Sequence, residues 1–371
     1  MTTPNNSLNS QVKDTNLNII TPTFEFDKFG IGVEDIKIEA EQLLKQGNDA
    51  KESKGLFTVK TATRWIEQAK TRPIPQMLFG EFWFEGELCI LFADTNLGKS
   101  ILAVQIANSI STGISTCGLK LECPPTPIIY FDFELSDKQF ENRYSENFTN
   151  HFSFSSNFLR AELNPDYFED KRFKTFEEFL FYSLEKSIVD YGVKVLIVDN
   201  ITYLKTDNEK AKDALPLMKF LKDLKNKYGL SILVLAHTPK IDTCKPITKN
   251  HLSGSKMLMN FCDSSFAIGE SHQEIGLRYI KQIKQRNCEQ VYDSENIIVC
   301  RIEKVNSFLQ FSFNGYDSEN EHLKTLSVGD ANERNSKIVE LFEKGNSKSE
   351  IGRLLGISEG TVRIILKKNN L

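Results

Sequence analysis

The sequence predicts an α/β fold with a mostly parallel central sheet, antiparallel strands after it, and a small all-α domain near its C-terminal end. Three patterns predict this fold. Apolar strand-like segments alternate with helix-like segments between residues 88 and 236, short strands follow one another from residue 265, and three short helices occupy residues 335–371. Alternation of strands and helices is typical of a parallel sheet, whereas strands in direct succession usually pair antiparallel.

The first strand runs into a phosphate-binding loop. Leu88–Phe92 is apolar, the loop ends in Gly98, Lys99 and Ser100, and helix-forming residues without Gly or Pro continue to Ile110. This order of strand, loop and helix is the context that a P-loop requires. We therefore expect Lys99 to reach the β- and γ-phosphates of a nucleoside triphosphate and Ser100 to ligate Mg²⁺ at the helix N-terminus. The predicted nucleotide-binding residues are Ala93, Asp94, Thr95, Asn96, Leu97, Gly98, Lys99, Ser100 and Ile101.

One residue departs from the pattern G-x-x-x-x-G-K-[ST]. Ala93 stands where the pattern has its first glycine, and residues 94–97 contain no glycine. If the position of Ala93 needs a positive φ, alanine costs about 1–2 kcal/mol, which a well-packed domain tolerates. The alternative is an ordinary strand–turn–helix in which Gly-Lys-Ser is incidental.

Strands and helices continue to alternate after the loop. Strands are predicted at 128–133, 158–163, 193–198 and 230–236, and helices at 137–148, 176–191 and 211–228. The later, antiparallel strands are predicted at 265–268, 277–282, 297–302 and 308–313. Before the loop, Trp65, Ile66 and Met77–Phe84 are hydrophobic enough to pack on the core.

Composition divides the chain into four segments. Residues 1–54 are expected to be a disordered or weakly helical arm with a helix at 33–46, and 55–315 the α/β domain. Residues 316–334 are polar and are predicted to be a linker, and 335–371 form the helical domain. A chain of 371 residues is long enough for one large core and a small accessory domain.

Charge and cysteine content narrow the functional classes. A net charge of −4 gives no global basic field, so any nucleic-acid site must be a local patch. The seven cysteines lack C-x-x-C spacing and are interpreted as reduced core thiols rather than a disulfide framework or a zinc site. No apolar stretch of about 18 residues occurs, and the N-terminus lacks the apolar core of a signal peptide. We therefore expect a soluble, cytoplasmic protein.

Two predicted strands end in carboxylates. Asp199 follows the strand at 193–198 and can hold Mg²⁺ or its water beside the phosphate loop, with a helix N-cap as the alternative. Glu134 follows the strand at 128–133, where it can orient or deprotonate the attacking water. Asp132 is the competing candidate for this base, and capping of the next helix is the alternative for Glu134.

Polar and basic residues follow the strand at 230–236. His237 and Thr238 end this strand, where they can sense the γ-phosphate, although a lone histidine is more often structural. The loop at 240–262 is long and basic, and Lys240 and Lys256 are candidates for contact with a phosphodiester backbone. The alternative is a solvated surface loop.

Residues 335–371 predict a helix-turn-helix. Ser347 and Glu350 form a capping box for the second helix, Gly356 supplies the turn, and Ser358 caps the third helix, Glu359–Lys368. The segment has seven Lys or Arg and four Glu, so it is basic inside an acidic chain. A small helical cap or an oligomerisation module is the alternative.

In their order along the chain, these motifs resemble the RecA-like ATPases, and more narrowly the hexameric helicases of the RepA type. The resemblance is carried by Ala93–Ser100, by Tyr130–Glu134 with Arg143 nine residues on, by Leu196–Asp199 and by Leu233–Thr238. Residues 283–287 also resemble the Lys-Gln-Arg-Asn element of DnaB-type replicative helicases. This second resemblance implies that Lys284 and Arg286 reach the γ-phosphate of a neighbouring subunit. The alternative is two solvated residues on an edge strand.

The helical tail is similar to the DNA-binding domains of resolvases and response regulators over residues 351–365. The resemblance implies that the residues facing the major groove of DNA are Ser358, Glu359, Gly360 and Arg363. It also implies that Lys367 and Lys368 meet phosphates.

Together, the motifs and resemblances predict a RecA-like ATPase that binds and hydrolyses ATP with Mg²⁺ and acts on DNA. Its predicted catalytic residues are Lys99, Glu134, His237, Lys284 and Arg286. One hypothesis is a homo-oligomeric, hexameric helicase or remodeller of a plasmid or mobile element, with single-stranded DNA in the ring and duplex DNA at the helix-turn-helix. The other is a regulator without motor activity, in which ATP binding controls assembly on duplex DNA. A small-molecule kinase is disfavoured because no arginine-rich lid is visible.

Overall fold

The computed structural model describes residues 57–371 except 165, 167–171, 201–213, 240, 253–254, 326–327, 356 and 370. The chain divides into two units, Met1–Pro73 and Ile74–Leu371, each described by itself. The predicted arm at 1–54 and its helix at 33–46 lie outside the described residues. Among the described residues, no helix combines the length and the apolar character needed to span a membrane.

The described part of the first unit contains helix α2 (Ala62–Lys70). Thr61 caps this helix, and its hydroxyl accepts a hydrogen bond from the Arg64 backbone N–H at 3.3 Å. The expectation that Trp65 and Ile66 pack on the core stays a prediction, because the two units are described each by itself.

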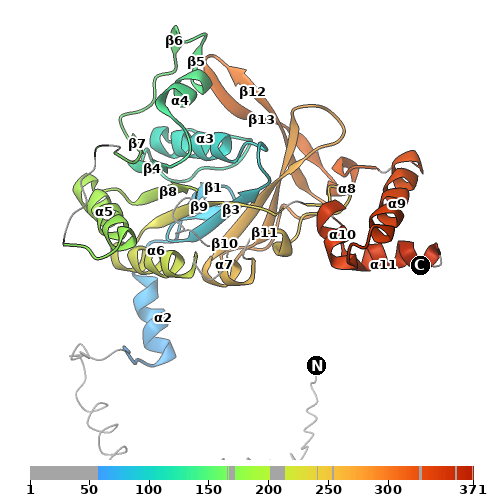
Figure 1. The fold of residues 1–371 in the computed structure, drawn as a ribbon. Helices are drawn as coiled ribbons and strands as arrows, with labels where there is room; N and C mark the ends of the chain where they lie inside the picture. Colours follow the sequence, from blue (N-terminus) through green and yellow to red (C-terminus); the bar gives the residue numbers. More distant parts are fainter. Residues whose placement is uncertain are drawn as a thin grey trace, which may run out of the picture. The chain divides into compact units, whose positions relative to one another are not determined.

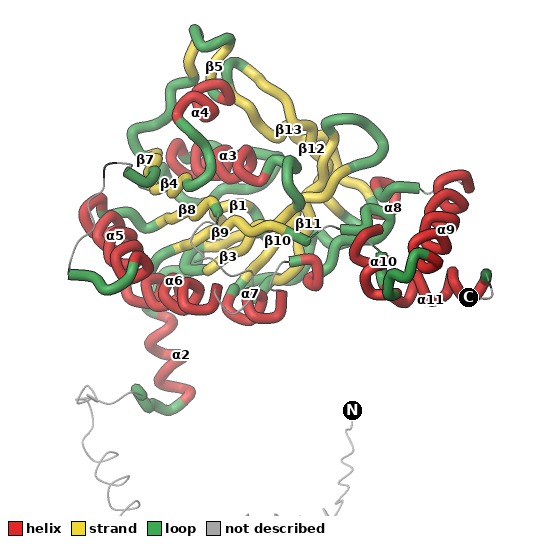
Figure 2. The backbone as a smooth tube through the Cα atoms, viewed as in Figure 1, coloured by secondary structure: helices red, strands yellow, loops and turns green. Residues whose placement is uncertain are grey.

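The second unit is built on a sheet in which nine of the described strands pair (Figures 1 and 2). Their order is β13-β12-β11-β10-β3-β9-β8-β4-β7. The strands are β3 (Leu88–Ala93), β4 (Ile128–Asp132), β7 (Phe158–Ala161), β8 (Val195–Asp199), β9 (Ser231–His237), β10 (Ser264–Glu270), β11 (Leu277–Lys284), β12 (Ile297–Val305) and β13 (Phe308–Asp317). Pairing is parallel from β10 across to β7 and antiparallel from β10 to β13. The predicted fold class is confirmed.

Helices cover both faces of the sheet. Figure 1 shows α3 (Lys99–Thr112) on one face and α5 (Phe176–Tyr191), α6 (Ala214–Tyr228) and α7 (Ser255–Phe261) on the other. Alternate residues of β3 serve the two cores: Cys89, Leu91 and Ala93 on the α3 face, and Leu88, Ile90 and Phe92 on the opposite face. Both faces of β3 are therefore buried, which explains its continuous apolar sequence.

Shorter elements flank the sheet. β1 (Met77–Phe79) pairs with β2 (Trp83–Phe84), and β5 (Ser145–Glu146) pairs with β6 (Asn150–His151). The helix predicted at 137–148 is wrong in its extent, because α4 (Asp137–Arg143) is followed at once by β5. Asn147 and Phe148 have φ values of 50° and 59°, which an α-helix does not allow.

The segment after β13 is anchored to the sheet. α8 (Glu319–His322) buries the Glu319 carboxylate, which forms an ion pair with the buried Lys281 of β11. Glu319 Oε1 also accepts hydrogen bonds from Ile247 N at 2.7 Å and from the Tyr279 hydroxyl at 3.2 Å. The first part of the predicted linker at 316–334 is therefore packed structure. The polar composition of this segment did not indicate that Glu319 forms a buried ion pair with Lys281, a residue far away in the sequence.

Three helices follow: α9 (Val328–Glu343), α10 (Lys348–Leu355) and α11 (Glu359–Lys368). They share a small core of Ile338, Ile351, Val362, Ile365 and Leu366, and we call them the three-helix unit. The helix α9 begins earlier than predicted, inside the expected linker.

The predicted caps of α10 and α11 are present. Glu350 N donates to Ser347 Oγ at 3.3 Å and Ser347 N donates to Glu350 Oε2 at 2.9 Å, which is a complete capping box. Thr361 N donates to Ser358 Oγ at 3.1 Å. The expected turn residue Gly356 lies outside the described residues, but a Cβ on Gly352 would lie 2.8 Å from Ile357 O. Glycine at position 352 therefore permits the close approach of α10 and the turn.

Candidate nucleotide-binding site

The phosphate loop, residues 94–98, joins β3 to α3. Asn96 and Gly98 have left-handed backbone conformations with φ values of 62° and 93°. Ala93 is not among the described residues with positive φ, so an alanine at this position causes no backbone strain. Asparagine is one of the residues that tolerate the left-handed region. The departure at Ala93 therefore does not distort the loop.

Gly98 is the glycine that the packing requires. A Cβ at this position would lie 2.9 Å from Ile302 Cδ1 and 2.9 Å from the ring of Phe311. β12 and β13 thus pack directly on the phosphate loop. The loop sequence contains no sign of this contact, because Ile302 and Phe311 come some 200 residues later.

Lys99 is buried, with 6% of its surface exposed, and its ammonium group braces the loop. Its Nζ donates to Ala93 O at 3.0 Å and to Asp94 O at 2.8 Å. Burial lowers the pKa of Lys99, and the nearby carboxylates of Asp199 and Glu134 oppose this shift. The lysine is thus held at the start of α3 beside two carboxylates.

Asp199 ends β8 and is completely buried. The Tyr130 hydroxyl donates to Asp199 Oδ2 at 2.5 Å, whereas Oδ1 has no hydrogen-bond partner among the described residues. Burial raises the pKa of Asp199 to about 6, while the side chains of Ser100 and Tyr130 oppose this shift. A buried carboxylate oxygen beside a serine hydroxyl is suited to a cation.

Asp132 and Glu134 have different surroundings. Asp132 is buried, its Oδ2 lies 2.9 Å from Arg160 Nε, and its Oδ1 accepts from the backbone N–H groups of Glu134 and Leu135. Glu134 is exposed and lines a cavity at the phosphate loop. The carboxylate of Asp132 is therefore occupied by structural contacts, whereas that of Glu134 faces the cavity.

Asn200 bridges Glu134 and His237. Its Nδ2 lies 3.2 Å from Glu134 Oε2 and 3.0 Å from His237 Nε2. With the amide as donor to both, His237 Nε2 accepts and the histidine carries its proton on Nδ1. Asn200 was not predicted as a site residue, although its position directly after the strand-end Asp199 is a usable signal.

Most of the predicted phosphate-loop residues line a cavity of about 230 Å³ together with Glu134 and His237, whereas Ala93, Asp94 and Leu97 are not among its lining residues. It is lined by Thr95, Asn96, Gly98, Lys99, Ser100, Ile101, Glu134, Arg143 and His237. Arg143 comes from the last turn of α4 and was not predicted as a site residue. Its Nη1 is buried without a hydrogen-bond partner among the described residues, as are Asp199 Oδ1 and Thr238 Oγ1. Because buried polar atoms are nearly always paired, this group of unpaired atoms indicates a site for a polar ligand.

The donor set fits Mg²⁺ bound together with phosphates. No group of three or more His, Cys, Asp or Glu able to hold a metal occurs in the part of the chain that the structure describes. Mg²⁺ is usually held by one or two protein groups, with water and substrate phosphates as its other ligands. Ser100 and Asp199 match that requirement.

Lys284 and Arg286 lie at the opposite edge of the sheet. β11 runs antiparallel to β10, which is parallel to β3, so the end of β11 is remote from the phosphate loop. Lys284 Nζ donates to Cys262 O at 2.6 Å, and Arg286 Nη1 lies 3.1 Å from Asp263 Oδ1. The two cations do not join Lys99 within one chain. Their action on a neighbouring subunit stays a prediction.

The basic loop after β9 is partly described. Lys240 and the side chain of Lys256 lie outside the described residues. Ile247 is bonded through both its N–H and its C=O, to Glu319 and to Lys281. The stretch around Ile247 is therefore anchored rather than a freely solvated loop.

The predicted DNA-contacting residues of α11 and its N-cap are all exposed: Ser358, Glu359, Arg363, Lys367 and Lys368. The Ser358 hydroxyl is already engaged as the helix cap, and Arg363 Nη2 lies 2.6 Å from Glu359 Oε1. These exposed pairs are weak and can exchange partners.

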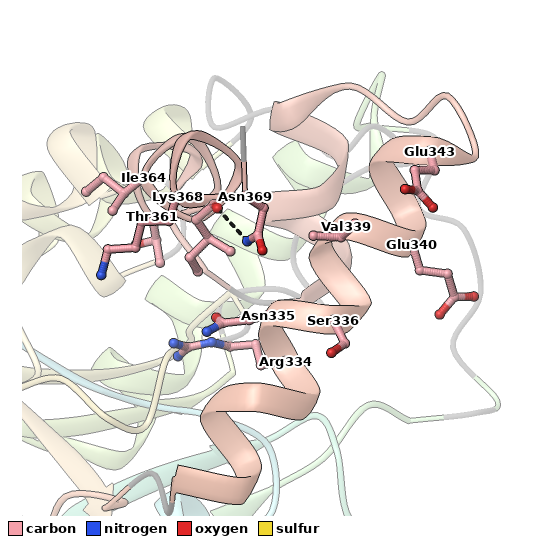
Figure 3. A pocket seen from close by; sticks show the side chains of 11 residues that line it. Arg334, Asn335, Ser336, Val339, Glu340, Glu343, Thr361, Ile364, Lys368 and Asn369 are labelled. Carbon is pink, nitrogen blue, oxygen red and sulfur yellow. Dashed lines mark hydrogen bonds between the residues drawn. The ribbon is translucent and has the colours of Figure 1, made fainter. Parts of the chain in front are cut away.

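A cavity of about 810 Å³ lies between α9 and α11 (Figure 3). Its lining mixes acidic, basic and apolar side chains, including Glu340, Glu343, Lys368, Val339 and Ile364. It contains none of the phosphate-loop residues, so it is separate from the candidate nucleotide site.

The loop, the buried lysine, the serine–aspartate pair and the strand-end glutamate define the class: a P-loop ATPase with a RecA-like fold. The chain belongs to the AAA_25 family, described as an AAA domain, which matches residues 56–242. No curated protein matches the chain. Among solved structures, the chain is similar to a KaiC-like protein from Pyrococcus horikoshii, with a TM-score of 0.43 and 12% identity, over 64% of this chain and 99% of that one.

Proposed function

We propose that the protein hydrolyses Mg²⁺-ATP to act on DNA, as a RepA-like helicase or remodeller of a plasmid or mobile genetic element. The observation that supports it most is the meeting of Lys99, Ser100, Glu134 and Arg143 at one small cavity. Asp199, with its unpaired buried oxygen, lies beside Ser100 and Lys99. This set supplies the positioning and charge stabilisation that phosphoryl transfer needs.

Each residue has a distinct role in this proposal. Lys99 exchanges the carbonyls of Ala93 and Asp94 for the β- and γ-phosphates. Ser100 and Asp199 hold Mg²⁺, which neutralises phosphate charge when it is bound. Glu134 orients the attacking water, and Arg143 faces the negative charge that develops on the γ-phosphate.

The proposed action on DNA involves two further surfaces. Single-stranded DNA would contact the basic segment that contains Lys240 and Lys256, inside a homo-oligomeric ring in which Lys284 and Arg286 complete the neighbouring site. Duplex DNA would contact α11 of the three-helix unit through its exposed basic side chains. Both surfaces would bind through phosphate contacts, so binding should weaken with salt.

The direct experiment measures ATP hydrolysis without DNA, with single-stranded DNA and with duplex DNA, and strand separation on a forked duplex. We expect single-stranded DNA to stimulate hydrolysis, the forked duplex to be unwound, and Lys99→Ala to abolish both activities. Hydrolysis indifferent to DNA, no unwinding, and a strictly monomeric particle with saturating Mg²⁺-ATP would overturn the proposal.

A second candidate is an ATP-gated DNA-binding regulator of replication, excision or transcription without motor activity. The observation that favours it is the intrachain pairing of Lys284 and Arg286, because cations already bonded to their own chain have contacts to lose before they act in trans. This candidate predicts site-specific duplex binding, slow hydrolysis and no strand separation. The forked-duplex assay therefore distinguishes the two.

A further inference from the structure

The hairpin β12–β13 approaches the nucleotide site from far along the sequence. Asn306 and Ser307 form its turn, both with positive φ; Val305 and Phe308 flank that turn, and Lys304 comes directly before Val305. Figure 1 shows the tip of this hairpin beside β5 and α4. Ile302, two residues before Lys304 on the same strand face, contacts Gly98 of the phosphate loop. β12 thus contacts α4 through Lys304 and the phosphate loop through Ile302.

The helix α4 needs an external support. It has seven residues, none of them buried, and it carries Arg143 in its last turn. A helix this short is unstable by itself. The side chains next to Arg143 in this region nevertheless pack on the hairpin: Tyr144 and Phe308 have ring centroids 5.0 Å apart.

Lys304 supplies the polar part of this support. Its Nζ donates to Asn142 O at 2.6 Å and to Ser145 O at 2.9 Å, carbonyls that lie on either side of Arg143 in the chain. Backbone carbonyls at the end of a helix lack partners within the helix, and a cation there also interacts favourably with the helix dipole. Both bonds are charge-assisted.

Arg143 is the group that this support places. Its guanidinium lines the cavity that contains Lys99 and Glu134, and Nη1 is buried without a partner among the described residues. The direction of the guanidinium depends on the backbone at residue 143, which the two Lys304 bonds hold from both sides. The geometry points to Lys304 as a positioning residue: its ammonium group fixes the end of α4 so that Arg143 faces the phosphate loop. This inference rests on the proposed ATP hydrolysis and deepens it.

The first test is the kinetics of Lys304→Met and Lys304→Arg. A misplaced Arg143 should act on the transition state, so Lys304→Met should lower kcat about 10-fold with KM changed less than about 2-fold. Lys304→Arg keeps a cation that can donate to both carbonyls and should restore most of kcat. Lys138→Met is the matched control, because Lys138 lies on α4 with its side chain 74% exposed and bonded to Glu141.

The second test asks whether Lys304 acts through Arg143. Arg143→Met alone should lower kcat more strongly than Lys304→Met. In the Arg143→Met background, adding Lys304→Met should cause no further loss, because the group that Lys304 positions is already gone. An equal fold-loss from Lys304→Met in both backgrounds would overturn the inference, as would a wild-type kcat for Lys304→Met.

A third measurement keeps the inference separate from the proposed function. Amide hydrogen exchange in residues 137–145 should become faster in Lys304→Met, and exchange in α5 should not change. Unchanged exchange in residues 137–145 would overturn the inference whatever the kinetics. Absence of hydrolysis by the wild-type protein would overturn the proposed function. The positioning role would then be judged by the exchange in residues 137–145 alone, and unchanged exchange there in Lys304→Met would overturn it.

Discussion

Glu134 and Asp132 are two residues apart, yet only one of them faces the cavity. Asp132 is buried and paired with Arg160, while Glu134 reaches the solvent side of the phosphate loop. Burial and pairing thus separate two chemically similar carboxylates into a structural group and a candidate base. The difference predicts opposite effects of removing each charge.

Glu134→Gln should lower kcat for ATP hydrolysis by about 10²–10⁴-fold, because it removes the group that orients the water. Nucleotide affinity and thermal stability should stay close to wild type. Asp132→Asn is the matched control: it should destabilise the fold by about 1–3 kcal/mol, because it removes the buried charge beside Arg160 Nε while Glu162 and Leu135 O still bind the guanidinium. Chemical denaturation and single-turnover kinetics check both variants. If Asp132→Asn lowered kcat and Glu134→Gln lowered stability, Asp132 would be the candidate base and Glu134 the structural group.

The buried Asp199 predicts a pH dependence for the metal-free protein. Its pKa is about 6 in the folded chain and near 3.8 when unfolded, so the folded state binds the proton more tightly. Stability from this group is fully present below pH 3.8 and is lost as pH rises through about 6. Asp199→Asn should therefore be more stable than the wild type above pH 6 by up to about 3 kcal/mol in EDTA. Denaturation curves that change equally with pH in both proteins would contradict this.

At the scale of elements, the C-terminal hairpin and the phosphate-loop helix act as one unit. The side chain of Gln105 on α3 donates to Phe311 O at 3.0 Å and accepts from Phe311 N at 2.7 Å. It also donates to Thr116 Oγ1 at 2.6 Å. The buried Gln105 side-chain amide therefore bonds both backbone groups of Phe311, as the backbone of a neighbouring strand would.

Gln105→Ala should lower the free energy of unfolding by about 1–3 kcal/mol, because it leaves the Phe311 N–H buried and unpaired and leaves the Phe311 C=O only the weak Cys117 Sγ donor at 3.5 Å. Gln310→Ala on the same hairpin is the control, since among the described residues the Gln310 side chain has a hydrogen bond only to the Ser312 hydroxyl. Urea denaturation of the two variants measures the difference. Equal stability in both would show that the Gln105 contacts contribute nothing.

At the scale of the whole molecule, the separation of Lys99 from Lys284 and Arg286 requires a second subunit if all three act on one phosphate. In a ring with head-to-tail contacts, each site would take Lys99 from one chain and Arg286 from the next. In this arrangement, the ATPase activity of a ring depends on which residues are intact in each pair of neighbouring subunits.

Lys99→Ala and Arg286→Ala, each inactive alone, should recover activity when they are mixed. A random ring of equal parts should reach about a quarter of wild-type activity, because one interface in four would carry both intact residues. A mixture of Lys99→Ala and Glu134→Gln is the control and should stay inactive, since those two residues line the same cavity of one chain. No recovery, or equal recovery in both mixtures, would contradict a site shared between subunits.

Local sequence patterns were sufficient to predict many of the helices and strands of this protein. The strand–loop–helix at 88–110 and the bounds of α5 and α11 follow from apolar periodicity and from caps such as Ser358, which act within a few residues. The meeting of Asp199, Glu134 and His237 was also predictable, because parallel strands bring their carboxyl ends to one edge. The contact of Gly98 with Ile302 and Phe311, the buried Glu319–Lys281 pair and the Lys304–α4 bonds were not. They join residues far apart in the chain, and their energies come from burial and from hydrogen bonds that exist only once the chain is packed.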